Sequence, residues 1–125
     1  MKDFAVALTH RVGELARVAK VLSRYGVNLK SVTGVAINGQ VQIRFLPDEA
    51  DAARSALEAG DIRFEEHEVL TVLLENRAGE LASLADRLAE ANVNLLAIYV
   101  TGIAGNLVEL ALVPDDVKKA KKILE

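Results

Sequence analysis

The sequence repeats itself, and this internal repeat constrains the fold more than any other feature. At an offset of 66 residues, the segment from Arg11 to Leu29 is identical to that from Arg77 to Leu95 at ten of nineteen positions. Beyond the expected hairpin turn the offset becomes 67, because the second copy holds one extra residue there. Turns absorb insertions more easily than packed elements do. The sequence therefore predicts two domains, at residues 1–67 and 68–125.

Each copy begins with the same succession of hydrophobic periods. Residues 4–8 alternate between larger and smaller side chains, which is typical of a strand. Residues 15–22 then place apolar side chains three and four positions apart, as on one face of a helix. Gly26 follows this helix, and Asn92 takes the same place in the second copy. Both residue types favour the left-handed backbone conformation that ends many helices.

The second half of each copy predicts a hairpin followed by another helix. Asn38-Gly39 and Gly105-Asn106 lie between extended apolar runs, as in two antiparallel strands joined by a tight turn. We expect Asp48 and Asp115 to cap the helices that follow. A closing strand is expected around residues 62–66 in the first copy, and the second copy has no equivalent.

This order of elements predicts an α+β fold. It describes two tandem ferredoxin-like βαββαβ units, each an antiparallel sheet with helices on one face, the final strand of the second unit being absent. Units of about sixty residues are near the lower limit for independent folding. We therefore expect the two units to share one long sheet.

One predicted strand indicates self-association. Residues 95–100 are apolar on both faces of the strand, and such strands are usually covered on both sides. We expect the helix-free face around Ile98 and Val100 to pack on another copy, giving a homodimer or a higher homo-oligomer. The alternative is an apolar sheet edge without a partner.

The composition excludes several classes of protein. The chain has no cysteine, so disulfides and thiolate metal sites are excluded. Its 15 basic and 18 acidic residues give a net charge of −3, without the basic surface that nucleic acid requires. Met1-Lys2-Asp3 does not resemble a signal peptide, and no apolar run is long enough to cross a bilayer. We expect a cytoplasmic protein that binds neither nucleic acid nor membrane and has no metal or cofactor.

The sequence contains few side chains suited to catalysis or to RNA recognition. His10 and His67 fall at non-equivalent positions of the repeat, and no histidine pair has metal-ligand spacing. An RNA-binding sheet needs several exposed aromatic rings. Only Tyr99 is a candidate, because Phe45 alternates in phase with the core. We expect His67 and its glutamate neighbours to form a solvated strand edge.

The repeated segments resemble the signature of the ACT domain. Residues 9–15, Thr-His-Arg-Val-Gly-Glu-Leu, and 75–81, Glu-Asn-Arg-Ala-Gly-Glu-Leu, each lead to a Val-Asn-Leu run at residues 27–29 and 93–95. The resemblance covers nearly the whole chain, twice. It implies a regulatory module that binds an amino acid, usually where the first loop of one domain faces the sheet edge of a neighbour.

The chemistry of these loops agrees with that reading. A glycine in the first turn brings unobstructed N–H groups to a helix N-terminus, which suits a carboxylate. Candidate acceptors for a ligand ammonium are an amide oxygen of Asn28, Asn76 or Asn94, or backbone carbonyls across the interface. The candidate ligand-binding residues are His10, Arg11, Val12, Gly13, Glu14, Leu15 and Asn28 in the first copy, and Asn76, Arg77, Ala78, Gly79, Glu80, Leu81 and Asn94 in the second.

The pattern leaves alternatives open. Val12 and Ala78 stand where the family usually has proline, and His10 replaces the acid or amide that Asn76 preserves. If only one loop binds, we favour residues 76–81. The loop glycines and the asparagines also have purely structural interpretations. The sequence thus predicts a non-enzymatic sensor that signals to a metabolic enzyme or regulator, or alternatively a ligand-free interaction or oligomerisation subunit.

Overall fold

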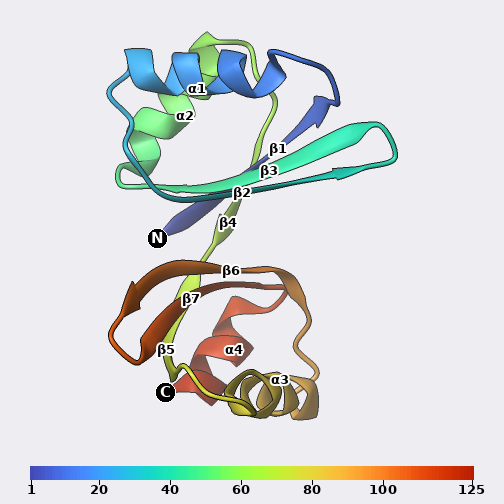
Figure 1. Cartoon of the computed structure of the whole chain (residues 1–125), viewed down its shortest axis with the longest axis vertical. Helices are drawn as coiled ribbons and strands as arrows, with labels where there is room; N and C mark the ends of the chain where they lie inside the picture. The colour runs from blue at the N-terminus through green and yellow to red at the C-terminus, as the bar shows by residue number, and fades with distance from the viewer. The chain divides into compact units, whose positions relative to one another are not determined.

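The computed structural model describes all 125 residues and divides them into two compact units, Met1–His67 and Glu68–Glu125. In each unit two helices lie on one face of an antiparallel sheet (Figure 1). This confirms the predicted α+β class built from tandem ferredoxin-like units. None of the helices has the length and apolar character needed to span a membrane.

The first unit has four strands in the order β2-β3-β1-β4. Asn38 and Gly39 join β2 to β3 with φ angles of 50° and 78°, the left-handed pair that this tight hairpin turn requires. Gly26, with φ 66°, follows the C-terminus of α1 as predicted. The elements are β1 (Lys2–Thr9), α1 (Glu14–Arg24), β2 (Leu29–Ile37), β3 (Gln40–Pro47), α2 (Ala50–Ala59) and β4 (Glu65–Glu68).

The second unit has three strands in the order β5-β7-β6. Asn92 ends α3 with φ 58°, as its place in the repeat predicts. The expectation of one long shared sheet is wrong, because the strands hydrogen-bond in two separate sheets. Strand alternation does not encode which edges pair. The elements are β5 (Leu70–Glu75), α3 (Glu80–Glu90), β6 (Leu95–Ala104), β7 (Leu107–Pro114) and α4 (Val117–Leu124).

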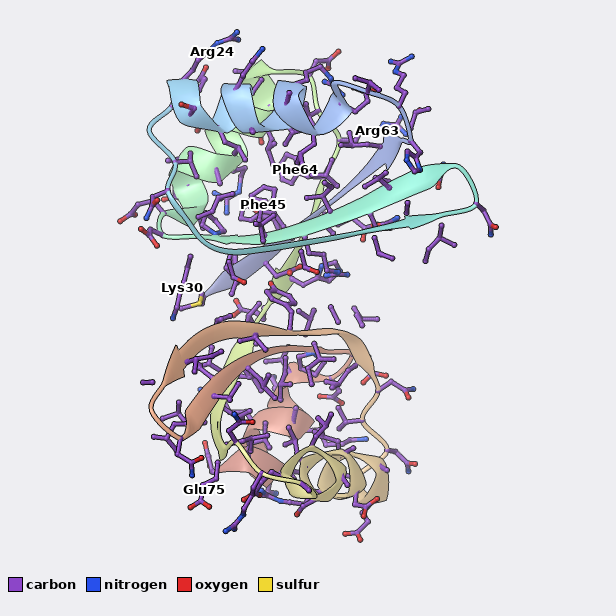
Figure 2. The ribbon with its side chains drawn as sticks, in the orientation of Figure 1. Arg24, Lys30, Phe45, Arg63, Phe64 and Glu75 are labelled. Carbon is purple, nitrogen blue, oxygen red and sulfur yellow. The ribbon has the colours of Figure 1, made fainter.

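Each unit has its own hydrophobic core between its helices and its sheet. In the first unit the Phe4 ring stacks on Phe45 with centroids 5.6 Å apart, and Phe64 packs against Phe4 at the same distance. Figure 2 shows Phe45 and Phe64 between the sheet and the helices of this unit. The second core is aliphatic and centres on Leu84 and Leu112.

The predicted caps are wrong by one residue. Helix α4 is capped by Asp116, whose carboxylate accepts from the Lys119 N–H at 3.0 Å. Helix α2 follows Glu49 without a side-chain cap. Asp48 and Asp115 have another role, because each binds the segment that begins β2 or β6. Proximity in sequence suggested a cap, whereas the partner lies about twenty residues earlier.

Strand β4 begins later than predicted and is not simply solvated. Ile62 is buried in the first core but precedes the strand, which begins at Glu65. The Glu66 carboxylate accepts from the Arg54 guanidinium at 2.6 Å, and this hydrogen bond raises the pKa of Arg54. His67 is half-buried, with Nδ1 3.8 Å from the Asp3 carboxylate. The expected solvated edge is therefore wrong for Glu66 and His67.

The strand register corrects the predicted helix-free face. Ile98 pairs with Leu112 and Val100 pairs with Leu110, and directly opposed residues share a face. Leu112 lies in the core under the helices, so Ile98 and Val100 are on the helix-bearing side. They remain 41% and 49% exposed because β6 is an edge strand and the helices pack mainly over β5 and β7. Tyr99, expected as an exposed ring, is buried.

Candidate functional site

The two repeated loops have nearly the same backbone. Gly13 has φ 92° and ψ −11°, and Gly79 has φ 91° and ψ −16°. Side chains rarely adopt this conformation, so the turn itself requires glycine. Both loops are also tied to the neighbouring hairpin turn: the His10 N–H donates to the Gly39 carbonyl at 2.9 Å, and the Asn76 N–H to Asn106 at 2.7 Å.

The first turns of α1 and α3 are open to a ligand. No side chain caps either helix. A Cβ built on either Gly13 or Gly79 would have no neighbouring atom within 4 Å. The N–H groups at a helix N-terminus carry partial positive charge and normally receive an acceptor. The structural role of the glycines and an anion-binding role are thus compatible.

Ion pairs fix the charged residues of the first loop. Glu14 is held between Arg11 and Arg17, each at 3.0 Å. The hydrogen bond from Arg17, with a further contribution from Arg11, lowers the pKa of Glu14. His10 and Leu15 are exposed, and the Val12 side chain is fully exposed.

In the second loop the arrangement of charges is reversed. Arg77 donates to Glu80 at 2.9 Å and lies 2.9 Å from the Glu75 carboxylate. Figure 2 shows Glu75 at the C-terminal end of β5. Sequence reasoning did not select Glu75. The repeat could have identified it, because the two copies differ in charge at this position: the equivalent residue in the first copy is Thr9.

A cavity of about 340 Å³ adjoins the second loop, and we call it the α3 cavity. The loop end is polar, and the rest of the lining is mostly aliphatic and comes from β5, β6 and β7. Leu81 and Ile98 both contribute to this aliphatic part. The complete lining is Leu74, Glu75, Asn76, Arg77, Glu80, Leu81, Ile98, Tyr99, Val100, Val108 and Leu110.

The structure does not bring the two remaining asparagines to these loops. Asn94 follows the C-terminus of α3, whereas the loop precedes its N-terminus, so about 15 Å of helix separates them. Asn94 lines a different cavity of about 510 Å³ and donates its backbone N–H to Asp115 at 3.1 Å. In the first unit the Asn28 side-chain amide donates to Asp48 at 2.8 Å.

Comparisons with known proteins bear on the fold. No protein-family model and no curated protein sequence matches the chain. A crystal structure of a protein from Bacteroides thetaiotaomicron aligns over 98% of this chain and 85% of its own, with a TM-score of 0.86 and 21% identity. The regulatory subunits of aspartate kinase from Thermus flavus and Thermus thermophilus, the latter ligand-free, have TM-scores of 0.70 and 0.67. Each is 16% identical and covers 98% of this chain, over 86% and 87% of its own length.

These similarities confirm the resemblance at the level of the fold. The aspartate kinase regulatory subunits are ACT-domain proteins, and this chain shares the ACT-domain fold over nearly its full length. Identities of this size carry no residue roles from one protein to the other. The function of the α3 cavity therefore has to be argued from its own residues.

Proposed function

We propose that the chain is a non-enzymatic regulatory protein that binds a small amino acid in the α3 cavity and passes the signal to a metabolic enzyme or regulator. The observation that carries the proposal is the division of this cavity into a polar end at a helix N-terminus and an aliphatic remainder. A zwitterion with a short side chain matches both parts. The similarity to regulatory subunits of aspartate kinase agrees with this function.

The proposed binding mode follows from the donors and acceptors at the loop. The Glu80 N–H donates to the Arg77 carbonyl, so the ligand carboxylate would accept hydrogen bonds from the next N–H groups of the first turn, those of Leu81 and Ala82. Its ammonium would donate to the Asn76 amide oxygen or the Glu80 carboxylate. The side chain would then lie against Leu81 and Ile98.

The α3 cavity is open, so the proposal includes a neighbouring domain that covers it. Ile98 and Val100 line the cavity and are half-exposed on the edge strand β6. Exposed apolar edge strands are usually paired or covered. A homodimer or higher homo-oligomer would cover this edge, and a ligand bound by two domains would stabilise their association.

A second candidate function rests on the same edge. Leu96 and Ile103 are also exposed on β6, at 53% and 71%. A subunit that uses β6 only to bind other chains would need no small ligand. This candidate predicts self-association or partner binding that no amino acid changes.

The test is thermal denaturation against the twenty amino acids, with two variants of one residue. We expect one or a few amino acids to raise the melting temperature of the natural chain. Gly79→Asp should abolish this rise, because it places a negative charge where the ligand carboxylate binds. Gly79→Ala is the matched control, since both variants strain the left-handed turn and only Asp adds charge. A flat response of the natural chain to all twenty contradicts the sensor proposal.

A further inference from the structure

The duplicated loops carry opposite net charge. In residues 9–17 the charged side chains are Arg11, Glu14 and Arg17, two cations against one anion. In the equivalent residues 75–83 one cation, Arg77, stands against two anions. The reversal comes from two positions only, at which the first copy has Thr9 and Arg17 and the second has Glu75 and Ser83.

The backbone does not account for this difference. The two loop glycines agree within about 5° in both φ and ψ. Both loops also make the same hydrogen bond to their hairpin turn. The two turns therefore have the same backbone but opposite net charge. The negative charge of the second loop is not required by the turn.

The charged groups of the second loop lie close enough to the α3 cavity to interact electrostatically with a ligand bound there. Glu75, Arg77 and Glu80 all line the cavity. Arg77 already forms ion pairs with the carboxylates of Glu75 and Glu80, at 2.9 Å each. It is therefore poorly placed to neutralise the side-chain carboxylate of a dicarboxylic amino acid. Apart from Tyr99, the residues that line the rest of the cavity are aliphatic and offer no donor to such a group.

The edge strand adds a second difference between the copies. Val100 lines the α3 cavity, whereas Gly34 occupies the equivalent position in β2 of the first unit. The second unit thus presents an apolar side chain where the first presents none. Together with the charge, this favours a ligand side chain that is aliphatic and uncharged.

We infer that Glu75 and Ser83 set the charge selectivity of the α3 cavity, which accepts neutral monocarboxylic amino acids and rejects dicarboxylic ones. This inference rests on the proposed function and names the ligand class for the same site. Glu75 contributes a repelling charge at the cavity rim. Ser83 contributes by leaving Glu80 without the second arginine that Glu14 has in the first copy.

The test is isothermal titration with L-leucine, L-asparagine and L-aspartate, whose side chains branch at the same carbon. Asparagine and aspartate differ mainly in charge, so their affinity ratio isolates the electrostatic part. The natural chain should bind leucine and asparagine more tightly than aspartate. The double variant Glu75→Thr/Ser83→Arg, which installs the residues of the first copy, should raise the relative affinity for aspartate by roughly five- to tenfold at low salt.

The control is the reciprocal double variant Thr9→Glu/Arg17→Ser, which makes the opposite charge change in the other unit. It should leave the asparagine-to-aspartate ratio of the α3 cavity unchanged. Glu75→Gln, which keeps the size of the side chain, supplies a milder variant, and circular dichroism checks that each variant folds.

The outcomes separate this inference from the proposed function. A ratio that stays constant in the Glu75→Thr/Ser83→Arg variant, while leucine still binds, overturns the selectivity inference alone. Tighter binding of aspartate than asparagine by the natural chain does the same. If none of the twenty amino acids binds the natural chain, both the inference and the proposed function fall.

Discussion

The two units share one plan but differ in what holds them together. The first has four strands and a core in which the Phe45 and Phe64 rings both pack against Phe4. The second has three strands, an aliphatic core, and a cavity beside the first turn of its first helix. The duplicated scaffold is thus filled by aromatic side chains in the first unit and by aliphatic ones in the second, and the second has a cavity beside its repeated loop.

The largest expected effect tests the contrast between the cores. Phe45→Ala removes a side chain that is 1% exposed and stacked on another ring, so it should cost about 3–5 kcal/mol of unfolding free energy. Leu112→Ala in the second core should cost about 2–3 kcal/mol, at the lower end of the range for such truncations. Urea denaturation measures the totals, and amide hydrogen exchange in β3 and β7 assigns each loss to its unit. Equal losses of unfolding free energy in the two variants would mean that the aromatic core contributes no more to stability than the aliphatic one.

A smaller effect tests what the two equivalent asparagines do. Asn28→Ala removes the side-chain donor to Asp48 at 2.8 Å, which should cost about 0.5–1.5 kcal/mol. Asn94→Ala should be nearly neutral, because Asp115 accepts from the Asn94 backbone N–H and that group remains. Urea denaturation of the two variants side by side gives the comparison. A costly Asn94→Ala together with weaker amino-acid binding would return Asn94 to the candidate site.

Much of the fold could be predicted from the sequence because the repeat applies local rules twice. Helix periodicity, the left-handed positions Gly26 and Asn92, and the Asn38-Gly39 turn depend on neighbouring residues, and the structure confirms each. The face on which Ile98 lies could not be predicted, because it depends on the register with β7. Strand alternation alone is compatible with either face.

The candidate site was predicted in part for the same reason. The loop residues Asn76, Arg77, Glu80 and Leu81 come from one short segment of the sequence and line one cavity, whereas Ala78 and Gly79 between them do not line it. Asn94 was grouped with them by its motif, but a whole helix lies between. The contributions of β7 to the lining come from long-range pairing, which no local pattern reveals.

The smallest expected effect concerns pH and the charge difference between the loops. The pKa of Glu14 is lowered from its ordinary value of 4.5, mainly by the hydrogen bond from Arg17. A lowered carboxyl pKa stabilises the folded chain above the ordinary value, and this contribution is lost as the pH falls through the folded pKa. Arg17→Ser, which installs the residue of the second copy, should therefore reduce the loss of stability on acidification below about pH 4.5.

The measurement is the urea midpoint of both proteins between pH 7 and pH 3. The natural chain and Arg17→Ser should differ most at neutral pH and converge in acid, because protonated Glu14 no longer benefits from the arginine. The pair is exposed on the arginine side, so added salt should shrink the difference at neutral pH. A difference that is constant across the pH range would mean that Arg17 acts through packing of its alkyl chain, and the charge contrast between the loops would then have no consequence for stability.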